Sequence, residues 1–210
     1  MDDKAYLDSI SSQVRPQKKS SGGLLSSPLI KVVIGGVVAI ILIIVLSSAF
    51  GGGGGGGGIK EKSIALKYHV DYTSVAIEDY QPSVKSSKLR SSSASLASIL
   101  SNMSRDLTNY LVDKYGFKDN AKENNKYKDK AQTHQTTLRN SLFNAKISGM
   151  LDRIYAHEMA HEIELIMAEE AAVYEKISGE KIKASLESTY NSLKNLYPDF
   201  DDFSESKWYN

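Results

Sequence analysis

The sequence predicts an all-α protein, with a single N-terminal transmembrane helix followed by an up-and-down bundle of four or five helices. An apolar run without a charge lies near the N-terminus, and only four prolines occur in 210 residues. After residue 58, apolar residues recur at intervals of three and four, which is the helical period, and clusters of turn residues are few. Cysteine is absent, which excludes disulfides, thiolate metal sites and thiol nucleophiles.

The N-terminal part divides into three segments. Residues 1–28 are rich in Ser, Lys, Asp and Gly and hold too few apolar side chains for a core, so we expect a disordered basic tail. Residues 29–50 are the predicted transmembrane helix, because an apolar run of this length, without a charge from residue 32 to 50, spans the roughly 30 Å of a bilayer core. The eight glycines of residues 51–58 form a flexible linker, and their uniformity leaves open an engineered spacer.

The apolar run also raises the question of cleavage. Ser47, Ser48 and Ala49 resemble a signal-peptide cleavage site, so a cleaved secretory signal is the alternative to an uncleaved signal anchor. The long leader and the long apolar run favour the anchor. Basic residues before the run slightly outnumber those that follow it, so we expect the N-terminus in the cytoplasm and the bundle outside it. The predicted location is the cell membrane, with the lipid bilayer as the partner of residues 29–50.

Residues 59–197 form the predicted bundle domain, and residues 198–210 an acidic and aromatic tail. The first predicted helix ends before Pro82, and the second runs over residues 82–115 and stops at Gly116. Residues 118–130 are polar and are interpreted as an exposed connection, before helices at 133–146, 150–177 and 181–197. The expected apolar faces of the first three helices are Ile64, Tyr68, Tyr72 and Val75; Leu89, Leu96, Leu100, Met103, Leu107 and Leu111; and Leu138, Leu142 and Phe143.

One chemical motif stands out in the fourth predicted helix. His157, Glu158 and His161 match H-E-x-x-H, in which two histidines one helical turn apart bind zinc and the glutamate activates water. On a helical wheel both histidines lie opposite the apolar arc, so we expect them to face solvent. A zinc peptidase also needs a third ligand, for which Glu180 or Glu187 are the candidates.

A second metal interpretation uses Glu158 and His161 as half of a carboxylate-bridged di-iron site. Neither His69 nor His134 follows a glutamate by three residues, so the sequence does not predict the other half. Glu170 falls on the apolar arc of its helix, and we expect it to reach solvent from the helix edge.

The stretch from Leu151 to Tyr155, with Asp152 and Arg153 inside it, precedes Met159 and a glutamate-rich helix. This pattern resembles ferritin-like four-helix-bundle domains of unknown function from bacterial envelope proteins, over about residues 135–197. Those domains begin with an aromatic residue where this chain has Leu151. The resemblance implies a helical bundle outside the cytoplasmic membrane, and it implies no activity or site.

Taken together, these features predict a membrane-anchored, non-catalytic structural or interaction module without a cofactor. Its expected partner is an unidentified protein or a second copy of the chain. Because 26 basic residues are balanced by 25 acidic ones, we expect no nucleic-acid partner. The alternative is a membrane-bound zinc metallopeptidase that uses Glu158 as its general base.

Overall fold

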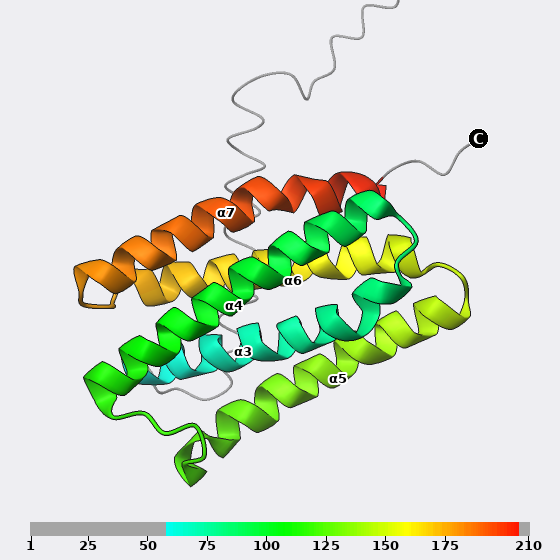
Figure 1. The fold of residues 1–210 in the computed structure, drawn as a ribbon. Coiled ribbons are helices and arrows are strands. Elements are labelled where there is room, and N and C mark those ends of the chain that lie inside the picture. The colour runs from blue at the N-terminus through cyan, green and yellow to red at the C-terminus, as the bar shows by residue number, and fades with distance from the viewer. Residues whose placement is uncertain (1–57, 206–210) are drawn as a thin grey trace, which may run out of the picture. The chain divides into compact units, whose positions relative to one another are not determined.

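The computed structural model describes residues 58–205, which contain five α-helices and no strand (Figure 1). The all-helical prediction is therefore confirmed for this part of the chain. The helices are α3 (Ile59–Tyr80), α4 (Ser87–Tyr115), α5 (Asn125–Ile147), α6 (Leu151–Tyr174) and α7 (Glu180–Glu205). Two short 3-10 turns, η2 (Gln81–Ser83) and η3 (Lys122–Asn124), precede α4 and α5.

The predicted tail, the transmembrane helix at 29–50 and nearly all of the glycine linker lie outside the described residues. Among the helices of residues 58–205, none is long and apolar enough to cross a bilayer.

All five helices of the described residues contribute to the main core. α6 packs against α7, α3 against α4, α4 against α7 and α3 against α6, so that α3, α4, α7 and α6 close a bundle. α5 packs chiefly on α3 and α6, and Figure 1 shows it at the edge of the view opposite α7. The side of α5 that faces these two helices is a narrow buried stripe. That stripe is Ala131, Gln135, Leu138, Leu142 and Ala145.

The stripe predicted for α4 is buried throughout, from Leu89 to Leu111. Its predicted end is also confirmed, because Gly116 caps the helix in the left-handed conformation with φ 61°. Its predicted start at Pro82 is wrong, because Pro82 lies in the turn η2. The helix begins at Ser87, where the Ser86 side chain accepts a hydrogen bond from the Leu89 amide, as expected of an N-cap.

Two helix faces and two helix boundaries also differ from the sequence prediction. Val75 of α3 and Phe143 of α5 are exposed, at 39% and 54%, instead of lying in the core. α5 begins at Asn125, so the last part of the predicted connection is helical. α7 continues through Pro198 to Glu205, into residues assigned to the tail. Pro198 removes one backbone hydrogen bond from the helix. The burial of Phe200 in the main core offsets the free energy lost with that bond.

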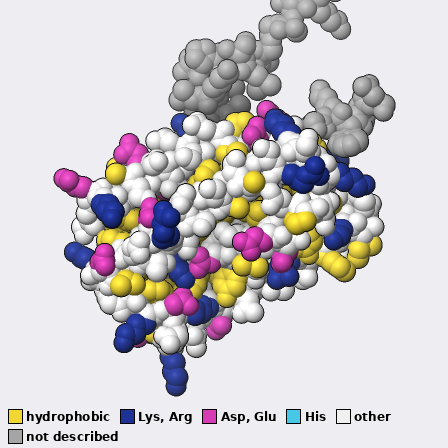
Figure 2. All heavy atoms as spheres, viewed as in Figure 1, with side chains coloured by type: hydrophobic (Ala, Val, Ile, Leu, Met, Phe, Trp, Pro, Cys, Tyr) yellow, Lys and Arg dark blue, Asp and Glu magenta, His cyan; other side chains and the backbone are white. Residues whose placement is uncertain are grey.

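The surface is of mixed charge. Figure 2 shows basic and acidic side chains interspersed over the visible face, with small apolar areas between them. Ion pairs such as Arg139 with Asp79, 2.8 Å apart, join neighbouring helices at this surface. Exposed pairs of this kind add little stability.

Candidate metal centre

The H-E-x-x-H motif of α6 lies on the outside of the bundle. His157 and His161 are both exposed, as the helical wheel predicts. Glu158 is half-buried, and its Oε1 accepts a hydrogen bond from Ser141 Oγ of α5 at 2.6 Å. Glu180 and Glu187 are exposed on α7. The motif is therefore formed as a helical pair, and no third ligand joins it among the described residues.

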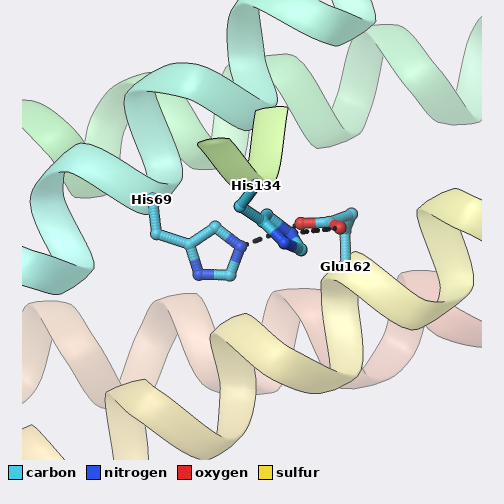
Figure 3. Close-up of side chains that lie close together, drawn as sticks. All are labelled: His69, His134 and Glu162. Atoms are coloured by element: carbon cyan, nitrogen blue, oxygen red, sulfur yellow. Dashed lines mark hydrogen bonds and ion pairs between the residues drawn. The ribbon is translucent and has the colours of Figure 1, made fainter. Parts of the chain in front are cut away.

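A different set of ligand-type side chains converges inside the bundle. His69 of α3, His134 of α5 and Glu162 of α6 offer three ligand atoms that lie within 4.8 Å of one another. His69 Nε2 is 2.8 Å from Glu162 Oε2, and His134 Nε2 is 2.7 Å from Glu162 Oε1. Figure 3 shows the two imidazoles pointing at the same carboxylate from separate helices. Their rings meet edge to face, with centroids 5.1 Å apart.

Two more polar side chains hold this cluster in place. Glu169 Oε2 lies 3.0 Å from His69 Nδ1, so His69 is held between two carboxylates. Thr73 Oγ1 donates to Glu162 Oε2 at 3.2 Å. A carboxylate on the far nitrogen of a histidine is the usual second partner of a metal-ligating imidazole, because it orients the ring and makes it more basic.

Helical spacing explains why these residues meet. Glu162 and Glu169 are seven residues apart on α6, and His69 and Thr73 are four apart on α3, so each pair occupies one face of its helix. On α5, His134 is next to Gln135, whose side chain donates to the Tyr72 carbonyl of α3 at 3.3 Å. The His134 ring therefore contacts both α3, at His69, and α6, at Glu162.

Three of the four ionisable side chains in the cluster are buried, and one is partly exposed. The side chains of Glu162, Glu169 and His69 are 2%, 7% and 8% exposed, whereas that of His134 is 39% exposed. Solvent therefore reaches the cluster from the side of α5.

The pKa values show how strongly these groups depend on one another. Burial alone opposes a charge on His69, but Glu169 and Glu162 reverse that effect and raise its pKa to about 10. Burial likewise opposes a charge on Glu162, and the hydrogen bonds from His134 and His69 lower its pKa far below the usual range. The result is a protonated His69 imidazole that lies between the buried carboxylates of Glu162 and Glu169.

The same groups match the requirements of a divalent metal ion. Two buried carboxylates are balanced either by protons on the imidazoles or by one dication bound to neutral imidazoles. Tetrahedral zinc with bonds of about 2.0–2.1 Å places its ligand atoms about 3.3 Å apart. The nitrogen–oxygen distances of 2.7 and 2.8 Å would have to open by about half an ångström to take such an ion.

Glu170, next in sequence to Glu169, has a separate environment. It is 1% exposed, and neither carboxylate oxygen has a hydrogen-bond partner. Burial raises its pKa to about 8, against a weaker opposing effect of the Tyr190 backbone. The expectation that Glu170 reaches solvent is wrong, because α7 covers the face of α6 on which it lies.

Sequence reasoning missed the cluster because it looked for both halves of a site within local motifs. His69, His134, Glu162 and Glu169 come from three helices, and no short pattern contains more than two of them. The available signal was the acidic pair seven residues apart on a helix with an apolar face, since such a pair is costly to bury without a cation.

The resemblance of residues 135–197 to ferritin-like domains stays a prediction. Comparisons with models of protein families, with curated proteins and with solved structures give no match.

Proposed function

We propose that the bundle binds one divalent transition-metal ion through His69, His134 and Glu162, with Glu169 orienting the His69 ring. The observation that carries this proposal is the convergence of three ligand atoms from three helices within 4.8 Å, at a site where two of the three side chains are buried. Exposed acidic clusters are common without a metal, but a buried glutamate shared by two histidines is costly to maintain unless a cation compensates it.

The donor set indicates the class of ion. Two imidazole nitrogens and one carboxylate suit zinc and the neighbouring first-row ions, including iron(II), cobalt(II) and nickel(II). Calcium and magnesium prefer oxygen ligands alone. Zinc is the ion we would test first, because histidine nitrogen and carboxylate oxygen are its usual ligands in sites with three protein donors.

We further propose that this metal-binding bundle is a membrane-anchored, non-catalytic module displayed outside the cytoplasm. The support is the apolar segment of residues 29–50, which has no charge from residue 32 onward, and the distribution of basic residues around it. The alternative of a zinc peptidase at His157, Glu158 and His161 gains no support from the geometry, because both histidines are exposed and lack a third ligand in the described residues.

The test is zinc binding by the full chain, purified in detergent without a histidine tag. Zinc content is measured by mass spectrometry, and affinity by competition with a chromophoric chelator. His134→Ala removes the half-exposed ligand and should disturb folding least. Loss of a supporting residue around a metal typically costs 10–100-fold in affinity, so we expect a loss of about 100-fold or more for this direct ligand.

His161→Ala is the matched control, because it removes an exposed histidine of α6 that does not join the cluster. We expect one equivalent of zinc in the wild type and in His161→Ala. Circular dichroism establishes that each variant is folded. A wild type without zinc affinity would refute the proposal. Loss of zinc on His161→Ala with retention on His134→Ala would move the site to the H-E-x-x-H motif.

A further inference from the structure

The proposed metal centre has fewer protein donors than a closed structural site. Structural zinc sites use four protein ligands, whereas sites with three ligands keep one position for water or an added molecule. Here the donors are one nitrogen from each of two histidines and the carboxylate of Glu162.

The remaining polar groups around the cluster have other partners. Glu169 faces His69 Nδ1, on the far side of the imidazole from Nε2. The Thr73 hydroxyl donates to Glu162, and the Gln135 amide donates to the Tyr72 carbonyl. Each of these three side chains therefore already has a hydrogen-bond partner.

The accessible side of the cluster is also the side with a basic residue. His134 is the exposed member, and Lys130 precedes it by one helical turn on α5. Burial lowers the pKa of Lys130, and the attraction of the Glu169 carboxylate opposes this effect. A bound dication and this ammonium both attract negative charge, so an anion is favoured over a neutral ligand in the open position.

We propose, on the basis of the metal site above, that the bound ion keeps one coordination position open toward α5, and that this position takes a small monodentate anion. The function of the bundle is then to bind such an anion through its metal. Water occupies the position when no anion is present. Lys130 favours the anion without contacting the metal, so it is a positioning residue.

Cobalt(II) makes this proposal measurable, because its visible absorption depends on coordination number and ligand type. The full chain in detergent is loaded with cobalt(II) and titrated with azide, a small monodentate anion. We expect a saturable spectral change that fits one site. His161→Ala should behave as the wild type does, since that residue lies outside the cluster.

Lys130→Ala should weaken azide binding several-fold while leaving cobalt affinity nearly unchanged. Lys126→Ala removes an exposed lysine one turn earlier on α5 and serves as the matched control. Cobalt binding with a spectrum that azide does not change would overturn the open position and leave the metal site intact. Failure to bind cobalt would overturn both proposals. Equal azide affinities in Lys130→Ala and Lys126→Ala would overturn the part assigned to Lys130.

Discussion

Glu170 allows a quantitative test of how the bundle tolerates a buried acid. Its side chain is 1% exposed, neither carboxylate oxygen has a hydrogen-bond partner, and burial raises its pKa to about 8. Because the folded pKa lies above the unfolded value of 4.5, the folded state retains the proton more strongly. The resulting stabilisation is full below pH 4.5, falls as pH rises, and is lost once pH has passed about 8.

The magnitude follows from the two pKa values. They differ by about 3.5, and each pKa unit corresponds to about 1.4 kcal/mol, so the whole effect is at most about 5 kcal/mol. Between pH 5 and pH 8 the wild type should lose at most about 3.5 kcal/mol relative to Glu170→Gln, which cannot ionise. For an m-value of about 2 kcal/mol per molar, that limit corresponds to about 2 M urea.

The assay is urea unfolding of the full chain in detergent, followed by circular dichroism at a series of pH values. EDTA is present so that metal binding does not contribute. Glu187→Gln, at an exposed site on α7, is the control and should follow the wild type. If the unfolding free energies of the wild type and Glu170→Gln run parallel from pH 5 to pH 8, the carboxyl group is not held neutral in the core.

Two further predictions concern the ends of helices. Phe200→Ala should cost about 3–5 kcal/mol in unfolding free energy, because the side chain is fully buried. Phe143→Ala, at an exposed site, should cost less than about 1 kcal/mol. Chemical denaturation measures both. A small loss for Phe200→Ala would contradict the packing of the last turns of α7. Gly116→Ala should cost about 1–2 kcal/mol through its positive φ alone, since a Cβ there meets nothing within 4 Å, and Gly116→Asn should cost less because asparagine tolerates this conformation. Equal melting temperatures for the wild type and Gly116→Ala would refute the left-handed cap.

The sequence predicted those features that depend on neighbouring residues. The long stripe of α4 repeats every three or four residues, and Gly116 ends it by a conformation that glycine adopts without strain. Both signals lie within one helix, so neither requires knowledge of what packs against it. The exposure of His157 and His161 followed from the same periodicity.

Predictions failed where the neighbours of a helix decide the outcome. Val75 and Phe143 are apolar residues at helical spacing, yet no other helix covers them sufficiently to bury them. Pro82 and Pro198 are both prolines in helix-rich sequence; the first lies in a turn before α4, whereas the second is retained inside α7, where Phe200 packs into the core. Local propensity cannot separate these cases, because the deciding free energy is burial against another helix.

By itself, the sequence determined the helical class of the described domain, the principal stripe of α4 and the outward orientation of the H-E-x-x-H histidines. Only the tertiary structure decided which ligand-type residues meet. His69, His134 and Glu162 are separated by 65 and 28 residues along the chain and share one site because α3, α5 and α6 pack side by side. The physical reason is that helical periodicity assigns each side chain to a face, whereas the register between packed helices determines which faces and which levels meet.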